Sequence, residues 1–173
     1  MNDVQLRKKL DELKAGEWNP VSPDTPYEKS ALEMFQGMIA GELPPPPIGQ
    51  SMDFLMSEAE EGHVVFVGWP AAAHLNPMGT VHGGWAATIM DSALACAVHS
   101  TCPAGRASTT VEMKLNYLRP IVPDSGMYRC EATIVQAGRT LGIAEARLTG
   151  PDGKLYAFGT ETCMIFDLPS RND

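Results

Sequence analysis

The sequence has no run of about 20 consecutive apolar residues, the length that a membrane-spanning helix needs. Its first ten residues include charged side chains and no apolar stretch of the kind found in secretory signals. Positive charge is also in deficit: 13 lysines and arginines stand against 21 aspartates and glutamates, a net charge of −8. This balance argues against non-specific binding to nucleic acid. We expect a cytoplasmic protein that binds neither nucleic acid nor a membrane.

Cysteine is scarce, with four residues in the chain: Cys96, Cys102, Cys130 and Cys163. In a cytoplasmic protein we expect four reduced thiols. The segment from Cys96 through His99 to Cys102 has residue types found in metal sites, but side chains at these spacings fan across a helix. Pro103 also biases Cys102 away from helical backbone. No fourth ligand is evident nearby, so we expect no metal, and Cys96 lacks an arrangement that would activate it as a nucleophile.

The composition is that of one globular domain with an appendage, since hydrophobic residues make up 44% and charged residues 20% of the chain. Apolar periodicity and turn residues predict helices over 3–15 and from Thr25 to about 39, with Thr25-Pro26-Tyr27-Glu28 as a capping box and Gly41 as the stop. The prolines at 44–47 predict a stiff extended segment. A hairpin (52–60 and 63–69), a loop (70–81), a long helix (82–99) and four strands (107–118, 127–137, 141–149 and 155–166) follow. One apolar helix followed by four strands indicates an α+β fold in which an antiparallel sheet wraps the helix.

The most informative segment runs from Asn76 to Trp85 and continues into the long helix. The paired glycines Gly83 and Gly84 allow the backbone N–H groups of the helix start to approach a ligand closely. The helix that follows is almost entirely small or apolar, and Asp91 is its only charged residue. A carboxylate in such a helix is costly unless it is paired, hydrogen-bonded or used in chemistry.

Helical geometry gives Asp91 small neighbours. Residues three, four and seven positions away share its face, and those on its N-terminal side are Gly84, Ala87 and Thr88. A face that only filled a core would more often carry large residues there. The carboxylate therefore projects from a face with room beside it. We take Asp91 as the first candidate catalytic residue.

This run resembles a known family, the hotdog-fold acyl-CoA thioesterases of the phenylacetate-degradation (PaaI-like) type. The matching residues are Asn76, Gly79, His82, Gly83, Gly84 and Asp91. The segments Thr109–Pro120 and Gln136–Thr140 are similar to a later strand and hairpin of that family. The resemblance covers about residues 48 to 167. It implies a hotdog domain at 48–173, preceded at 1–47 by a helical extension and a proline-rich linker.

The resemblance implies hydrolysis of an acyl-CoA thioester, with no cofactor other than the coenzyme A of the substrate. The Gly83 N–H at the positive end of the helix suits an oxyanion donor. Asp91 would act either as a general base on water or as a nucleophile, and both routes stay open. His82 and Asp91 lie about 13 Å apart along the helix, too far for one site in one chain. In this family the loop of one protomer faces the carboxylate of its partner, which implies a homodimer or a dimer of dimers.

The other candidate residues have a structural as well as a functional interpretation. Asn76 would brace its loop or orient the attacking water, and His82 would bond the helix start or assist the chemistry. Thr110 matches a family position that helps to place water, while by itself it is an ordinary strand residue. Gly84 is expected beside the substrate, and Arg139 is a candidate partner for the nucleotide of coenzyme A.

Two other functions were considered. A hotdog-fold hydratase would use an Asp-x-Asn-Pro-x-His element. The segment from His74 to Gly79 has the Asn-Pro pair but lacks both the Asp and the His, which excludes that chemistry. A non-catalytic acyl-CoA binding or sensing protein is the remaining alternative, because a fold does not fix a function. Saturable release of free coenzyme A would separate the enzyme from the sensor.

Overall fold

The computed structural model describes residues 1–16 and 19–170; residues 17–18 of the predicted extension and 171–173 of the predicted hotdog domain lie outside the described residues. The helices are α1 (Asp3–Lys14), α2 (Thr25–Glu28), α3 (Ala31–Ala40), α4 (Pro47–Met52) and α5 (Gly83–His99), with a short 3₁₀ turn at Ala72–His74. The strands are β1 (Phe54–Glu60), β2 (His63–Gly68), β3 (Arg106–Tyr117), β4 (Tyr128–Ala137), β5 (Leu141–Thr149) and β6 (Leu155–Asp167).

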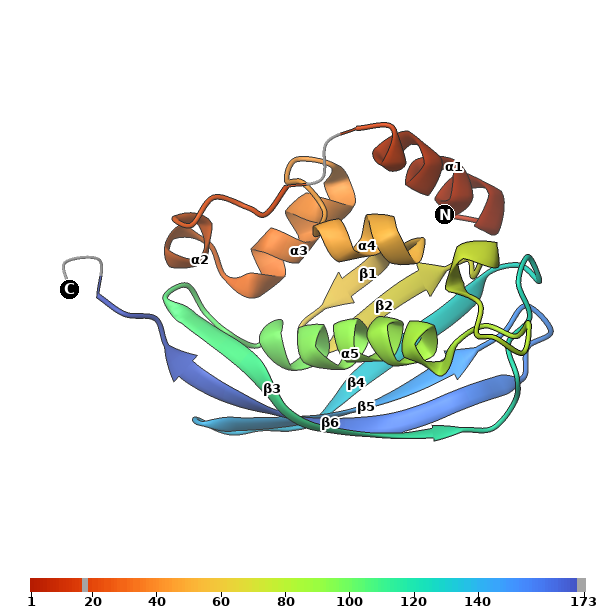
Figure 1. Ribbon diagram of the computed structural model, residues 1–173. Coiled ribbons are helices and arrows are strands. Elements are labelled where there is room, and N and C mark those ends of the chain that lie inside the picture. The colour runs from red at the N-terminus through yellow and green to blue at the C-terminus, as the bar shows by residue number, and fades with distance from the viewer. Residues whose placement is uncertain (17–18, 171–173) are drawn as a thin grey trace.

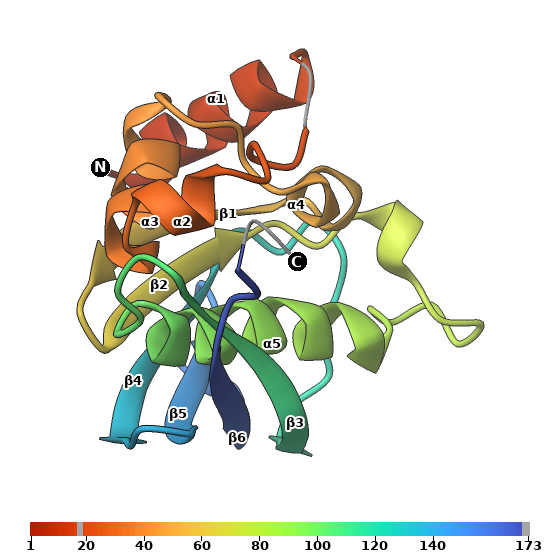
Figure 2. The same cartoon turned by 90° about the vertical axis from the view of Figure 1, so that its left-hand side faces the viewer.

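The six strands form one antiparallel sheet in the order β1-β2-β4-β5-β6-β3. The sheet curves around α5, which lies along its concave face (Figures 1 and 2). The predicted α+β arrangement, a long helix wrapped by an antiparallel sheet, is therefore confirmed. The hairpin at 60–63 also has the predicted register, since Glu60 pairs with His63.

Alternation along the strands explains why the sheet can approach α5 so closely. In β5 the inward positions are Gly142, Ala144, Ala146 and Leu148, all buried, while the residues between them are exposed. Small inward residues let the helix backbone approach the sheet. A Cβ at Gly142 would overlap the side chain of Val98 at the C-terminal end of α5. The core is built around α5, with Trp85, Ile89 and Met90 among its buried members.

The N-terminal helices lie over the β1–β2 end of the sheet (Figure 1). Leu6 and Leu10 of α1 pack with Leu55, Val65 and Val67, a second core cluster separate from the one around α5. Ala31 and Phe35 of α3 belong instead to the main core. The extension thus packs on both sides of this corner of the sheet. The predicted domain boundary between residues 47 and 48 falls at the first turn of α4.

Three predicted boundaries near the N-terminus were wrong. The single helix from Thr25 is two helices, because Lys29 is extended and α3 begins after Ser30. Ser30 forms a capping box of its own: its Oγ accepts from the Glu33 N–H at 3.3 Å, and its N–H donates to Glu33 Oε2 at 2.8 Å. The main helix begins at this second capping box because the longer apolar stripe follows it. Gly41 ends α3 in the left-handed conformation, φ 83°, as expected.

The other two corrections concern the proline segment and the first strand. Pro47 was expected to be extended and Met52 to begin a strand, yet both lie in α4. Pro47 occupies the first turn of that helix, where proline's missing N–H has no consequence. The strand β1 begins at Phe54, after Asp53 in the left-handed conformation. Within the described residues, no helix is long and apolar enough to cross a membrane.

Candidate active site

Asp91 lies near the middle of α5 and is half-buried, facing β3. Thr110 of β3 stands opposite, and its Oγ1 lies 3.4 Å from Asp91 Oδ1 and 2.8 Å from Glu161 Oε1. A hydroxyl group has one proton to donate, and the shorter contact indicates that it is given to Glu161. Thr110 therefore links a carboxyl group of α5 with one of β6.

Glu161 is the residue that sequence reasoning missed. It is fully buried, with 0% of its surface exposed, and its Oε2 has no hydrogen-bond partner among the described residues. Oε1 also receives the Sγ–H of Cys163 at 3.2 Å. Burial, and secondarily the neighbouring Asp91, raises the pKa of Glu161 from 4.5 to about 7, against the hydrogen bonds from Thr110 and Cys163, which lower it. The period-2 pattern of β6 was the available signal, since Glu161 falls between the inward residues Gly159 and Cys163.

The N-terminus of α5 presents a free backbone donor. His82 is the N-cap, and its Nδ1 accepts from the Gly84 N–H at 2.8 Å. A Cβ at Gly84 would lie 2.8 Å from that same nitrogen, so only glycine allows this cap. The exposed Gly83 N–H has no acceptor among the described residues. The chain thus leaves the Gly83 N–H, at the positive end of the helix dipole, available to an incoming oxygen.

Asn76 holds the loop before α5. Its Oδ1 accepts from the N–H groups of Met78 at 2.9 Å and Thr80 at 3.3 Å, and its Nδ2 donates to Thr80 Oγ1 at 2.8 Å. Leu75 and Val81 close the same loop through an isolated antiparallel bridge. In this chain Asn76 therefore sets the path of the loop that leads to Gly83.

A single chain does not bring these parts together. Gly83 and Asp91 are eight residues apart on one helix, about 12 Å along its axis. Arg139 lies exposed in the β4–β5 turn, and its carbonyl oxygen accepts from Arg106 Nη2 at 2.6 Å. That turn is near the C-terminal end of α5, where Gly142 faces Val98. Each chain therefore carries a donor half and a carboxylate half at separate places on α5.

Comparison with known proteins identifies the family. The family model described as "Thioesterase superfamily" matches residues 78–157. Mouse acyl-coenzyme A thioesterase 13 is 36% identical over 90 residues, which is 51% of this chain and 63% of the mouse protein. The crystal structure of a phenylacetic acid degradation-related protein of Ralstonia eutropha is 30% identical, with a TM-score of 0.69, and the match covers 76% of this chain and 98% of that one. The chain belongs to the thioesterase superfamily.

The resemblance to hotdog-fold thioesterases is thereby confirmed, and with it the hotdog fold. A thioesterase of Streptococcus pneumoniae, solved with coenzyme A, shares the fold at a TM-score of 0.61 and 24% identity, over 68% of this chain and 92% of that one. The chain spans less than two thirds of the length of the curated relatives that it matches, 56% to 63%. The family match contains Gly83, Asp91 and Thr110, whereas Glu161 and helices α1 to α4 fall outside residues 78–157.

Cys96 is not activated as a nucleophile at this site. Burial, together with Asp91 and Glu161, raises the pKa of Cys96 to about 12, which keeps the thiol protonated near neutral pH. All four cysteines are free. Across residues 1–16 and 19–170, no group of three or more His, Cys, Asp or Glu side chains is placed to hold a metal ion.

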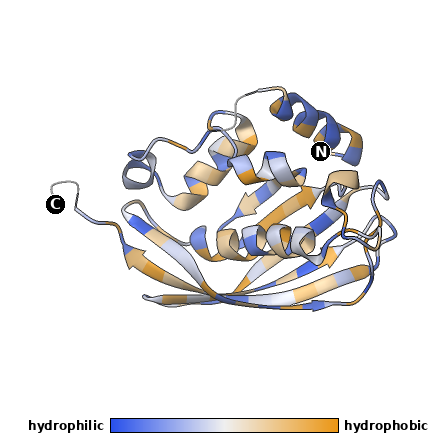
Figure 3. Ribbon diagram, in the orientation of Figure 1, coloured by the Kyte–Doolittle hydropathy of each residue, from blue (hydrophilic) through white to orange (hydrophobic). Residues whose placement is uncertain are grey.

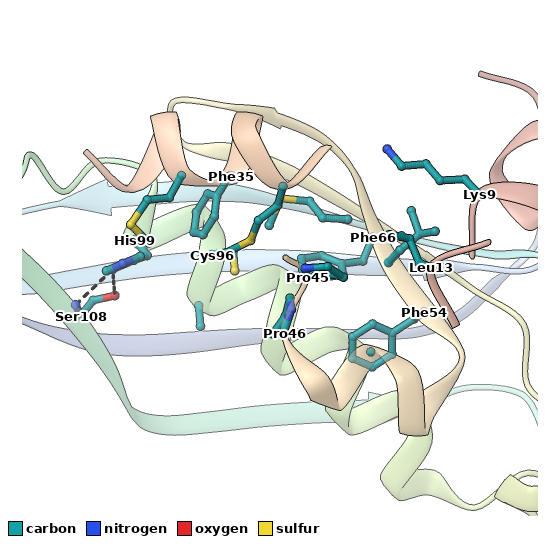
Figure 4. A pocket seen from close by; sticks show the side chains of 16 residues that line it. Lys9, Leu13, Phe35, Pro45, Pro46, Phe54, Phe66, Cys96, His99 and Ser108 are labelled. Carbon is teal, nitrogen blue, oxygen red and sulfur yellow. Dashed lines mark hydrogen bonds between the residues drawn. The ribbon is translucent and has the colours of Figure 1, made fainter. Parts of the chain in front are cut away.

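Two of the hollows that adjoin α5 bear on this site. One, of about 320 Å³, adjoins the helix start and is lined by His82, Gly83 and Tyr117 among others. The other, of about 330 Å³, lies between the N-terminal helices and the C-terminal half of α5 (Figure 4). Its lining includes Ala95, one helical turn beyond Asp91, and Ser108, two residues before Thr110 on β3.

Proposed function

We propose that this protein hydrolyses acyl-CoA thioesters to a free acid and coenzyme A. The observation that carries the proposal is the half-buried Asp91 on α5, joined through Thr110 to a buried second carboxyl group. The names of its relatives support the substrate class, since mouse acyl-coenzyme A thioesterase 13 is among them and the Streptococcus pneumoniae thioesterase was solved with coenzyme A.

Hydrolysis of a thioester needs few catalytic groups from the protein. A thiol has an ordinary pKa of about 8.5, so the coenzyme A thiolate leaves without a strong general acid. The Gly83 N–H would stabilise the negative oxygen that forms when the carbonyl carbon is attacked. Asp91 would take a proton from water as the water oxygen bonds to that carbon, or would attack the carbon itself and form an anhydride that water then cleaves. His82 and Asn76 would hold the loop and helix start in place.

We further propose that the working unit is a homodimer with shared sites. Within the described chain, β3 lies at one end of the sheet and pairs only with β6, which leaves a 12-residue strand edge open. A long open edge is a template for pairing with another strand. Pairing β3 with the β3 of a second chain would place two α5 helices side by side, so that Gly83 of one chain could approach Asp91 of the other.

The outer face of the sheet supports a larger assembly. Figure 3 shows hydrophobic residues recurring along the strands below α5, and the alternating burial along β5 and β6 leaves some of them exposed on the face away from α5. The exposed members include Ile143, Phe158, Met164 and Phe166. Apolar residues gathered on one exposed sheet face favour a protein contact, and two dimers joined through this face would form a dimer of dimers.

Arg139 is the proposed partner of the nucleotide end of coenzyme A. A contact between its guanidinium and a phosphate would be charge-assisted and weakened by salt. We expect Arg139→Ala to raise KM for acyl-CoA more than it lowers kcat, and to leave a truncated thioester without the nucleotide nearly unaffected. Steady-state kinetics on both substrates measure this difference. An equal loss on the two substrates would instead indicate a structural role for the side chain.

The central test is Asp91→Asn. The amide keeps the size of the side chain but cannot act as base or nucleophile, so kcat should fall on the order of 10²-fold or more. Release of free thiol from a panel of aryl-, short- and long-chain acyl-CoAs measures kcat. Glu60→Gln is the matched control, because it removes an exposed carboxylate at the β1–β2 hairpin. Near-normal kcat in a folded Asp91→Asn protein would refute the assignment. Binding of acyl-CoA without turnover by the wild type would favour a sensor.

A further inference from the structure

The N-terminal helices build one wall of an apolar cavity whose opposite wall belongs to the thioesterase domain. The extension supplies Lys9, Leu13, Met34, Phe35, Met38, Pro45 and Pro46, and the domain supplies Gly49, Phe54, Leu55, Met56, Phe66, Ala95, Cys96, His99 and Ser108. The family match begins only at residue 78. Twelve of the sixteen lining residues, including every one that the extension supplies, therefore lie outside the family match.

The cavity lies beyond the carboxylate on the same side of α5. Ala95 follows Asp91 by four residues and His99 by eight, so all three share one stripe of the helix. On β3, Ser108 precedes Thr110 by two residues and points to the same side of the sheet. The cavity thus begins about 6 Å beyond Asp91 along the helix axis. An acyl group whose carbonyl reached Asp91 would direct its tail into this space.

The shape and lining of the cavity favour an aliphatic acyl chain over an aromatic ring as its ligand. Figure 4 shows the lining side chains spread from His99 and Ser108 at one end to Lys9 and Leu13 at the other. A volume of about 330 Å³ holds roughly ten methylene groups if each takes about the 30 Å³ of a liquid water. Met34, Met38 and Met56 can adapt to a flexible chain.

The polar groups at the two ends are already engaged. His99 Nδ1 accepts from the Ser108 N–H at 3.2 Å and contacts Ser108 Oγ at 3.1 Å, and burial lowers the pKa of His99, which keeps the ring uncharged. The Lys9 ammonium donates to the carbonyl oxygen of Ile39, which ties α1 to α3. Lys9 Nζ and His99 Nδ1 therefore already have hydrogen-bond partners within the protein.

We infer that this cavity binds the tail of an unbranched, medium-length aliphatic acyl-CoA, an inference that rests on the proposed function of the Asp91 site. Each methylene that enters an apolar pocket should raise kcat/KM about threefold to fourfold, until the space is filled near ten carbons. The extension would then determine which acyl group this thioesterase prefers.

The test is a chain-length series from acetyl-CoA to decanoyl-CoA, with phenylacetyl-CoA alongside. In Met38→Trp the larger side chain fills the cavity, so kcat/KM for decanoyl-CoA should fall at least tenfold more than for acetyl-CoA. Gln36→Trp is the matched control, because it places a tryptophan at an exposed position of α3. Met34→Phe is a milder second variant. A wild-type preference for phenylacetyl-CoA, or equal sensitivity of both tryptophan variants, would overturn the inference.

Binding separates this inference from the proposed function. Calorimetric titration of Asp91→Asn with decanoyl-CoA and acetyl-CoA needs no turnover. Tighter binding of decanoyl-CoA, lost on adding Met38→Trp, would support the cavity even if no acyl-CoA were hydrolysed. Equal affinity for the two ligands would refute the cavity even in an active enzyme.

A second inference rests on Glu161. Its Oε1 accepts hydrogen bonds from Thr110 and Cys163, its buried Oε2 has no described partner, and the Asp91 carboxyl group raises its pKa. The titratable groups that influence it are Asp91 and Cys96 of α5 and Cys163 of β6, and none of them carries positive charge. A second bare carboxylate at this place would face Asp91 with no cation to offset the repulsion. We propose that Glu161 is held protonated and donates its Oε2 proton to Asp91, so that it positions the reacting carboxylate.

Under this proposal Glu161 is a positioning residue, and pH profiles test it. Wild-type kcat should fall as pH rises above about 7, because ionisation removes the proton that Asp91 accepts. Glu161→Gln offers an N–H that does not titrate, so its kcat should be lower but flat between pH 6 and 9. Glu161→Leu offers no donor and should lose more activity than Glu161→Gln. An unchanged alkaline limb in Glu161→Gln, or equal kcat in the two variants, would refute the proposal.

Discussion

At the scale of single residues, the site depends on two carboxyl groups with different surroundings. Asp91 is half-buried on α5, whereas Glu161 is fully buried between α5 and the sheet. The desolvation that raises the pKa of Glu161 is the cost of placing a second acid beside the first. The Thr110 hydroxyl can donate to only one of them at a time. The protonation of Glu161 therefore determines which carboxyl group accepts this hydrogen bond.

The pKa of Glu161 makes folding stability depend on pH. Between pH 4.5 and about 7 the folded protein holds a proton that the unfolded chain has released, so the free energy of unfolding falls as pH rises through this window. The contribution is on the order of 3 kcal/mol. Glu161→Gln should remove this slope. Between pH 5 and pH 8 its free energy of unfolding should therefore fall less than that of wild type. Urea unfolding at the two pH values measures it, and an unchanged slope would show that Glu161 is ionised in the folded protein.

At the scale of elements, the site depends on β3 staying paired with β6. Thr110 lies on β3 and Glu161 on β6, and the pairing of Leu115 with Gly159 belongs to the same ladder. Gly159 lets the two backbones approach closely, since a Cβ there would overlap the carbonyl oxygen of Lys114. The close approach at Gly159 thus holds the element that carries Thr110 against β6, in addition to the hydrogen bond from Thr110 to Glu161.

Gly159→Ala should therefore destabilise the fold by about 2 kcal/mol, because the new methyl group forces β3 away from β6. Activity should fall as well, since Thr110 would move relative to Asp91. Urea unfolding and thiol release give the two measurements. Gly16→Ala is the control, because the added carbon would lie 3.4 Å from the carbonyl oxygen of Leu13, an ordinary van der Waals distance. Equal stability of Gly159→Ala and wild type would mean that the strands adjust without cost.

At the scale of the whole molecule, the two proposed catalytic groups lie at separate places on α5. The free Gly83 N–H and the Asp91 carboxylate lie about 12 Å apart. The β1 edge of the sheet is covered by the N-terminal helices, so β3 is the edge left for a second chain (Figure 2). The extension therefore has two proposed consequences: it closes one edge, and it walls the acyl cavity.

Mixing two inactive chains tests the shared site. Gly83→Pro removes the N–H donor yet suits the first helical position, and Asp91→Asn removes the carboxylate. An equal mixture with free exchange forms about half hybrid dimers, each with one intact site, so activity should recover to about a quarter of wild type. Native mass spectrometry would establish the exchange. No recovery despite exchange would place both groups of a working site in one chain.

The sequence by itself determined much of this molecule. Apolar periodicity located α5 and the strands, and the His-Gly-Gly run with Asp91 marked the family and the candidate carboxylate, because these signals are local in the chain. Tertiary structure decided the rest. The capping box forms at Ser30 rather than at Thr25, because the longer apolar stripe that follows Ser30 packs on the core. Glu161 became a partner of Asp91 only when β6 and β3 paired, since residues 70 positions apart carry no local sign of their contact. The acyl cavity likewise exists only where the extension folds back over α5.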